Sequence, residues 1–396
     1  MNKHDTGPLL LGLAYLSFIS LGLPDGLLGV AWPSIRAYFQ LPLDALGSLL
    51  VMFTIGYLLA SFSTGRILAR INVGALLAAS CLATALSLFG YAMTQWWWIM
   101  VGLSTLAGLG AGAIDAGLNT YAATHFSAAS VNWLHAFFGV GATLGPRIMT
   151  SVLNAQQPWQ WGYVIVGAAQ LLLAACFGLT HKLWANDQNE VGLAQDSASP
   201  ISPAATRSTL RLPVAWLGLG VFFIYTGVEA AAGAWSYSLF TESRGVSLIT
   251  AGTWVSVYWG CLTAGRILSG FVVKHVPVPL LLRFCMLGIA LGAAMMWLNL
   301  TSLFGFLGFA MIGLCCAPIF PSLIATTPER IGAAHTANAV GFQIAASVLG
   351  QALLPSLAGV LARNFTLEIL GPFVLSAALL LWVLFEGMAR PWAKVF

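Results

Sequence analysis

The chain has 396 residues, of which 59% are hydrophobic and only 7% are charged, against about 25% charged in an average soluble domain. So few charges cannot cover the surface of a soluble protein of this length, and we therefore expect an integral membrane protein. The net charge of +4 comes from basic residues scattered at helix ends, so we expect no nucleic-acid partner. The six cysteines lie in apolar runs without CxxC or Cys/His spacing, so we expect no disulfide, metal site or cofactor.

Twelve apolar runs are each long enough to cross the hydrocarbon core, which takes about 20 helical residues. We therefore expect an all-α membrane protein with twelve transmembrane helices near 8–38, 44–68, 72–94, 96–124, 130–153, 160–182, 212–240, 248–273, 278–299, 302–326, 333–363 and 367–388. The first run continues to Phe39. It is too long for a signal peptide and has no basic leader or small-residue cleavage site, so we retain it as a helix.

One long polar segment, His181–Leu210, divides the twelve runs into two sets of six. Its Asn, Asp, Gln, Ser, Pro and Ala residues are typical of a flexible linker. We therefore expect an N-terminal six-helix bundle at 1–182, a cytoplasmic linker at 183–211 and a C-terminal six-helix bundle at 212–396.

The two sets also show a weak internal repeat. Three positions match at a constant offset, Gly56 with Gly260, Ala60 with Ala264 and Arg70 with Lys274. Twelve spans with a repeat at half their length predict two pseudo-symmetric bundles around a central cavity.

The distribution of Lys and Arg predicts that both termini are cytoplasmic. With that orientation the cytoplasmic side carries Lys3, Arg66, Arg70, Lys182, Arg207, Arg211, Lys274, Arg283, Arg330, Arg390 and Lys394. The outer side carries only Arg36, Arg147, Arg244 and Arg363. We expect a multi-pass protein of the plasma membrane, or of the inner membrane in a bacterium.

A carboxylate in the fourth predicted helix, Asp115, is the strongest functional candidate. A charge at the centre of a membrane helix costs at least about 2.5–3.5 kcal/mol, so it needs a reason to be there. Asn119 lies four residues on and therefore on the same helix face. Asp115 is either an ion-coupling or substrate site, or a structural residue that hydrogen-bonds to Asn132 or His135 in the fifth helix. His135 is either a proton relay or a packing residue.

The first helix contains Asp25 within the sequence Leu-Pro-Asp-Gly. Proline and glycine interrupt the helical hydrogen bonds, which is tolerated at this depth only where protein or a water-filled cavity satisfies the backbone. Asp25 either caps the second half of a broken helix or serves as a proton or cation site on the cavity wall.

The seventh helix contains Glu229, and Trp235 follows six residues later. A carboxylate and an indole together can bind the hydroxyls and the apolar ring face of a sugar, whereas Trp235 alone can be an interfacial anchor. Arg266 in the eighth helix needs a partner, and the candidates are Glu229 and Asp115. We expect it to form a gate or a structural ion pair.

The eleventh helix adds two amides, Asn338 and Gln343, that either bind substrate hydroxyls or join helices. Pro318 and Pro321 predict a bend in the tenth helix.

At these residues the sequence resembles the major facilitator superfamily, and within it the branch of fucose:proton symporters and sodium-dependent glucose transporters. The resemblance lies in Asp115 to Asn119, in the Leu134 to Pro146 segment, and in a third group in the seventh and eighth helices. That group comprises Tyr225, Gly227, Glu229, Gly233, Trp235, Trp259, Gly265 and Arg266.

The resemblance implies ion coupling at Asp115, and a place beside the central cavity for Asn119, Asn132 and His135. Asp25 departs from the fucose pattern by about one turn. Ala69 stands where the superfamily's loop between the second and third helices usually has aspartate, so the inner gate must be held in another way.

We therefore expect a secondary transporter, not an enzyme, that couples H⁺ or Na⁺ to symport of a monosaccharide or similar small polar solute by alternating access. The coupling candidates are Asp115, Asp25, Glu229 and His135. The substrate candidates are Asn119, Asn132, His135, Glu229, Trp235, Trp259, Asn338 and Gln343. The alternative is a proton-driven exporter of amphiphilic compounds or metabolites. We expect a monomer in the lipid bilayer.

Overall fold

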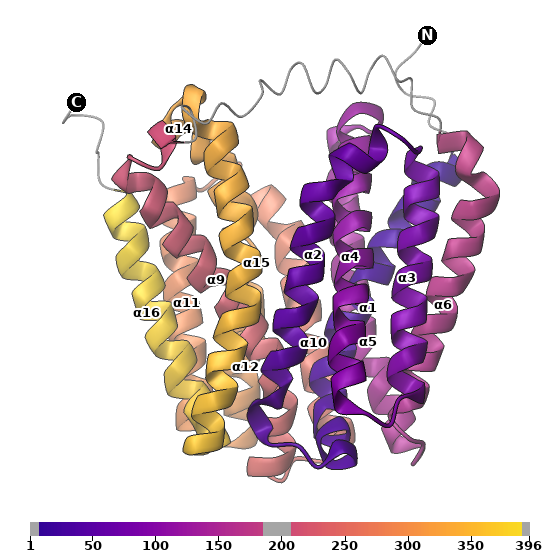
Figure 1. Ribbon diagram of the computed structural model, residues 1–396. Coiled ribbons are helices and arrows are strands. Elements are labelled where there is room, and N and C mark those ends of the chain that lie inside the picture. Colours follow the sequence, from indigo (N-terminus) through magenta and orange to yellow (C-terminus); the bar gives the residue numbers. More distant parts are fainter. Residues whose placement is uncertain (1–7, 185–206, 390–396) are drawn as a thin grey trace.

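The computed structural model describes residues 8–184 and 207–389, apart from five side chains near residue 127 (those of 123, 124, 128, 129 and 132). Six long helices form the first half: α1 (Pro8–Phe39), α2 (Leu46–Leu68), α3 (Val73–Met93), α4 (Trp97–His125), α5 (Ala128–Asn154) and α6 (Gln160–Thr180). In Figure 1 these six helices stand upright in the right-hand part of the molecule.

The second half contains α9 (Pro213–Ser238), α10 (Leu248–Val272), α11 (Val278–Leu298), α12 (Ser302–Cys316), α13 (Ile319–Ala325), α14 (Thr327–Ile331), α15 (Ala333–Asn364) and α16 (Leu370–Ala389). The short elements are η1 (Leu43–Ala45), η2 (His181–Trp184), η3 (Leu239–Ser243) and η4 (Leu367–Ile369). Most of the predicted linker, residues 185–206, lies outside the described residues.

Twelve helices of the described chain are long and apolar enough to cross a membrane, with bounds within three residues of those predicted. The predicted membrane architecture is therefore confirmed. Large apolar side chains such as Leu179 and Met93 are more than 80% exposed, which in water would favour aggregation and in a bilayer means contact with lipid tails. The predicted bend is also present, because α12 ends at Cys316 and α13 begins at Ile319, on either side of Pro318.

The alternative in which Asp25 caps the second half of a broken first helix is wrong, because α1 runs without interruption through Pro24. Pro24 has no N–H to donate, so the carbonyl of Ser20, four residues earlier, loses its helical partner. The amide Nε2 of Gln170 in α6 donates to that carbonyl at 2.9 Å. The backbone is thus satisfied by a neighbouring helix, and Asp25 caps no helix terminus.

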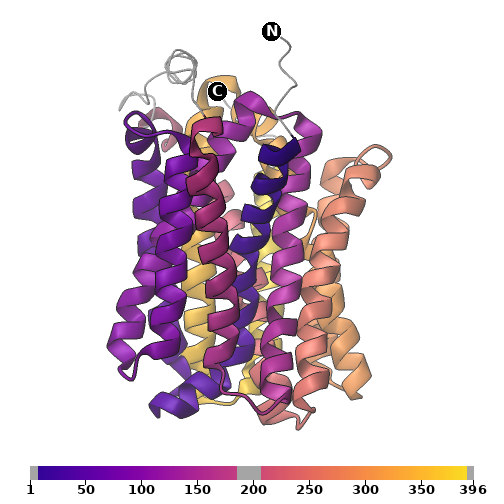
Figure 2. The same cartoon turned by 90° about the vertical axis from the view of Figure 1, so that its right-hand side faces the viewer.

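Helices of the same half pack on one another, α2 on α4, α1 on α5 and α3 on α6 in the first half, and α9 on α15 and α11 on α12 and α16 in the second. The halves meet along α5 and α10, α2 and α15, and α1 and α9. Figure 2, turned by 90°, shows the long helices running between the same two ends of the molecule. One end is where α1 begins and α16 ends, and we call it the terminal end.

At the end opposite the terminal end, the two halves are in direct contact. A Cβ atom added to Gly47 of α2 would lie 2.8 Å from the hydroxyl of Ser356 in α15. One added to Gly252 of α10 would lie 1.8 Å from the hydroxyl of Thr150 in α5. Only glycine fits so close a crossing. In both helix pairs the backbone of the glycine therefore contacts a side chain of the partner helix.

At the terminal end the same helix faces are separated. Gly65 lies 18 residues after Gly47, and Gly270 lies 18 residues after Gly252, which is five full turns and the same face of each helix. A Cβ added to either Gly65 or Gly270 would meet nothing within 4 Å. The halves therefore diverge toward the terminal end, and the molecule is open there and closed at the other end.

Two ion pairs join the halves at the closed end. Arg36 at the end of α1 donates to Glu242 in η3 at 2.7 Å. Arg363 near the end of α15 contacts Asp44 in η1 at 3.1 Å. Each pair takes one residue from each half, so both must separate before this end can open.

Candidate functional site

Asp115 lies in α4 and accepts a hydrogen bond on each carboxylate oxygen. The phenol of Tyr57 in α2 donates to Oδ2 at 2.5 Å, and Nδ2 of Asn119, one turn on, donates to Oδ1 at 2.9 Å. The helices approach closely enough for the first bond because α4 has glycine where it crosses α2. A Cβ on Gly112 would lie 2.4 Å from the carbonyl oxygen of Tyr57.

The two donors suit the ionised form of the carboxylate. A phenol and an amide N–H, both neutral, each offer a hydrogen to one oxygen of Asp115, and bonds to a charged group contribute about 1.5–3 kcal/mol each. Asp115 forms no ion pair with a described Lys or Arg side chain. The side chain is half-buried.

His135 in α5 faces the region between Asp115 and the second half. Its ring is exposed and lies edge-on to Phe18 of α1, with 5.4 Å between ring centroids. It interacts electrostatically with both Asp115 and Arg266. The hydrogen bonds to Asp115 come from Asn119, which shares its helix face, and from Tyr57, which was not predicted. The side chain of Asn132 lies outside the described residues.

Glu229 is the buried acid of the second half. The phenol of Tyr225, one turn earlier in α9, donates to Oε2, and Arg266 of α10 lies 3.6 Å from Oε1. The phenol of Tyr258 also donates to the Glu229 backbone carbonyl, at 2.9 Å. The predicted ion pair of Arg266 with Glu229 is therefore present, and it fixes α9 to α10 within one half.

Asp25 is exposed although it lies in the middle of α1, which packs against α5, α6 and α9 on several sides. Its neighbours Gly22 and Gly26 are pressed against the α5 backbone, where an added Cβ would lie 2.1 Å and 2.5 Å from carbonyl oxygens. The carboxylate interacts electrostatically with Glu229 of the other half. Asp25 therefore faces the accessible space between the halves.

The remaining predicted substrate residues are not brought to this space. Trp235 is 1% exposed, and its indole donates to the carbonyl of Pro355 in α15 at 2.8 Å. It is a packing residue, neither a sugar platform nor an interfacial anchor. Trp259 is also buried, against Gly233 of α9.

The two amides of α15 are buried as well. Oε1 of Gln343 accepts a hydrogen bond from Thr327 of α14 at 3.1 Å, so this amide joins elements of one half. Asn338 is 9% exposed. A substrate role for either requires a rearrangement of the second half.

Two tyrosines, Tyr57 and Tyr225, were not predicted to take part in the site. Tyr225 was detectable, because it precedes Glu229 by four residues and shares its helix face. Tyr57 was not, because its bond to Asp115 depends on how α2 crosses α4. Among the described residues, no three His, Cys, Asp or Glu side chains gather closely enough to hold a metal ion.

Comparison with known proteins agrees with this architecture. The chain is 25% identical over 317 residues to the "Glucose/mannose transporter GlcP" of Bacillus subtilis, covering 77% of this chain and 76% of that protein. It is 26% identical over 225 residues to "Bypass of stop codon protein 6" of Saccharomyces cerevisiae, covering 52% of this chain and 42% of that longer relative. The chain thus spans less than half the length of the yeast protein that it matches.

Among solved structures, a bacterial homologue of the human lysosomal transporter Spinster, in an inward-facing and occupied conformation, superposes with a TM-score of 0.78. The match covers 100% of this chain and 98% of that chain at 13% identity, and at this identity it shows the fold alone. The family pattern matches residues 14–355, most of the chain. This multi-pass membrane protein, a transporter and not an enzyme, therefore belongs to the Major Facilitator Superfamily.

Proposed function

We propose that the protein is a cation-coupled symporter of a monosaccharide or a similar small polar solute. The observation that carries the proposal is the carboxylate of Asp115, half-buried in a membrane-spanning helix and held by neutral donors alone. Such a carboxylate can bind and release H⁺ or Na⁺, because no Lys or Arg side chain of the described residues is paired with it. The glucose and mannose named for the Bacillus relative favour a hexose as cargo.

The substrate and the coupling cation are proposed to bind from the accessible space between the halves. Asp25 and His135 face this space from the first half, and Arg266 and Glu229 border it from the second. Hydroxyl groups of a sugar can accept from Asn119 or Arg266 and donate to Asp25. The coupling cation, H⁺ or Na⁺, binds at Asp115 and neutralises the carboxylate.

Alternation is proposed to exchange the open and closed ends by rocking one half against the other. The two ion pairs at the closed end, Arg36–Glu242 and Arg363–Asp44, are exposed to solvent. Exposed pairs contribute about 0–1 kcal/mol each. Together they stabilise the conformation that is closed at this end, but by too little to prevent it from opening. If the termini are cytoplasmic, as the Lys and Arg distribution predicts, the structure is inward-facing.

The test is uptake of radiolabelled hexoses into proteoliposomes that contain the purified protein, with an imposed H⁺ or Na⁺ gradient. Accumulation against the sugar gradient in response to one ion supports the proposal. If a panel of hexoses shows neither accumulation nor counterflow, the sugar assignment fails. Expulsion of an amphiphilic compound in exchange for protons would favour an exporter instead.

A further inference from the structure

Two helices, α5 and α10, join the halves through contacts between glycine and threonine. A Cβ added to Gly139 of α5 would lie 2.2 Å from the hydroxyl of Thr263 in α10. Nearer the closed end, α10 supplies the glycine and α5 the threonine. The α5–α10 seam, as we call this row, comprises the contacts Gly139–Thr263, Gly260–Thr143 and Gly252–Thr150. Small residues of these types let membrane helices approach closely.

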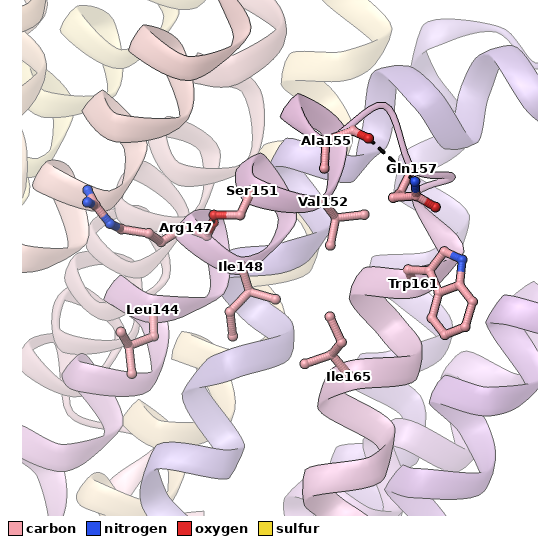
Figure 3. A pocket seen from close by; sticks show the side chains of 9 residues that line it. All are labelled: Leu144, Arg147, Ile148, Ser151, Val152, Ala155, Gln157, Trp161 and Ile165. Atoms are coloured by element: carbon pink, nitrogen blue, oxygen red, sulfur yellow. Dashed lines mark hydrogen bonds between the residues drawn. The ribbon is translucent and has the colours of Figure 1, made fainter.

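The seam lies on the opposite face of α5 from α6. Figure 3 shows Ile148 and Val152 of α5 on one side of a groove and Ile165 of α6 on the other. Thr150 is two residues from both Ile148 and Val152, and two residues rotate by about 200° around a helix. Gly139, nine residues before Ile148, is about half a turn from it by the same count. The seam can therefore separate without moving α5 relative to α6.

The Gly139–Thr263 contact lies far from the closed end. Gly139 is fifteen residues from Asn154, where α5 ends, and Thr263 is fifteen residues from Leu248, where α10 begins. At 1.5 Å per residue, both lie about 22 Å along their helices from the closed end. Because α5 has 27 residues and α10 has 25, this contact lies past the middle of both helices.

The seam ends directly beyond this contact. Gly270 follows Thr263 by seven residues, which is nearly two full turns and the same face of α10. A Cβ added to Gly270 would meet no atom of the described residues within 4 Å. The two helices therefore separate between Thr263 and Gly270, and Gly139–Thr263 is the contact next to the point of separation.

The seam carries no hydrogen bond that would resist tilting. Each of its threonine hydroxyls donates to the carbonyl four residues earlier in its own helix, at 2.6 to 2.8 Å. Ser256 lies in α10 between Gly252 and Gly260, and its buried hydroxyl has no partner among the described residues. A buried hydroxyl without a partner is unfavourable and is satisfied when water reaches it. Separation of the closed-end part of the seam therefore breaks none of these bonds and hydrates Ser256.

We propose that the Gly139–Thr263 contact is the pivot on which the two halves rock. This inference rests on the alternating access proposed above, but not on the identity of the solute or of the coupling ion. When the closed end opens, the seam separates at Gly252 and closes toward Gly270. Gly139 and Thr263 stay in contact in both conformations.

The pivot lies beside the candidate transport site. His135 precedes Gly139 by four residues, and Arg266 follows Thr263 by three. Displacements next to a pivot are small compared with those at the helix ends. His135 and Arg266 therefore keep nearly the same separation in both conformations, and a solute bound between them stays in contact with both halves as access alternates.

Two disulfides across the same pair of helices test the pivot. Gly139→Cys/Thr263→Cys places one at the pivot, and Thr150→Cys/Gly252→Cys places the matched control at the closed end. The Cβ atoms of the two pairs would lie 2.9 Å and 2.8 Å apart, so both need the same small separation of the helices. In oxidised proteoliposomes we expect the pivot disulfide to leave hexose uptake intact. The closed-end disulfide should abolish uptake until dithiothreitol is added.

A second readout needs no solute. Ser256 is 5% exposed and becomes accessible when the closed-end part of the seam separates. N-ethylmaleimide should label Ser256→Cys in the protein with the pivot disulfide, but not in the protein with the closed-end disulfide. Each cross-linked protein without Ser256→Cys gives the background from the native cysteines.

The labelling of Ser256→Cys decides the proposal. Equal labelling of the two cross-linked proteins, or labelling of neither, would overturn it. Failure of the pivot pair to cross-link under conditions that cross-link the closed-end pair would also overturn it, because the two sides of a pivot stay in contact throughout the cycle. If labelling follows the expectation but no hexose is taken up, the pivot stands and the sugar assignment fails.

Discussion

The phenol of Tyr57 donates a 2.5 Å hydrogen bond to the carboxylate of Asp115, which lies 58 residues away in the sequence. The bond joins α2 to α4 within the first half, and α2 also forms part of the contact with the second half through Gly47 and Ser356. A change of charge on Asp115 therefore acts directly on a helix at the interface between the halves.

Replacing Tyr57 by phenylalanine should lower cation-driven uptake about 10-fold without preventing folding. The substitution removes one of two donors to the ionised carboxylate, and bonds to charged groups contribute about 1.5–3 kcal/mol. Initial uptake rates in proteoliposomes measure the effect. Tyr38→Phe is the control, because Tyr38 is exposed near the end of α1, away from Asp115. Equal loss in both variants would show that the Tyr57 phenol has no special role.

A disulfide across the closed end should stop transport. In the Gly47→Cys/Ser356→Cys double variant the two Cβ atoms would lie about 3.0 Å apart, slightly below the usual 3.5–4.5 Å of a disulfide, so a small separation of the helices allows the bond. We expect oxidation to abolish exchange and dithiothreitol to restore it. The single Gly47→Cys variant should be insensitive to oxidant, apart from any effect on the native cysteines. Full transport by the oxidised double variant would show that transport does not require this end to open.

The buried ion pair of the second half should show a large coupling in stability. Arg266→Gln alone leaves Glu229 buried without its cation, which typically costs about 3–5 kcal/mol. The double variant Arg266→Gln/Glu229→Gln removes both charges and should be more stable than Arg266→Gln alone. Melting temperatures of the purified variants, compared as a double-mutant cycle, measure this difference. If the losses of melting temperature in the two single variants simply add in the double variant, Arg266 and Glu229 do not stabilise each other across their 3.6 Å contact.

Weakening the ion pairs at the closed end should raise the population of the conformation that is open at this end. Glu242→Gln and Asp44→Asn each remove the acid of one pair. Because the two exposed pairs contribute at most about 1 kcal/mol each, we expect the double variant to raise the population open at this end by up to about 30-fold. Distances between spin labels on the two halves would report the shift. An unchanged distance distribution would show that packing alone closes this end.

The twelve spans could be predicted from the sequence because a membrane helix depends mainly on a local run of apolar residues. The pairing of Asp115 with Asn119 was equally accessible, since residues four apart share a helix face. The Tyr57 bond was not accessible, because it arises from a close crossing of two helices that only the packing of Gly112 reveals.

For Trp235 the sequence interpretation placed a buried packing residue in the substrate site. Six residues rotate about 240° around a helix at 100° per residue, so Trp235 cannot share the face of Glu229 and instead packs against Pro355. Continuity of α1 through Pro24 was also unpredictable, because the compensating donor, Gln170, lies on another helix.

The most direct test of the account is cation-driven accumulation of a transported hexose by Asp115→Asn in proteoliposomes, measured together with sugar counterflow. The account predicts that accumulation disappears while counterflow persists, because the amide keeps the shape of the site but cannot take up a cation. Accumulation at the wild-type level by Asp115→Asn would contradict the assignment of Asp115 as the coupling residue.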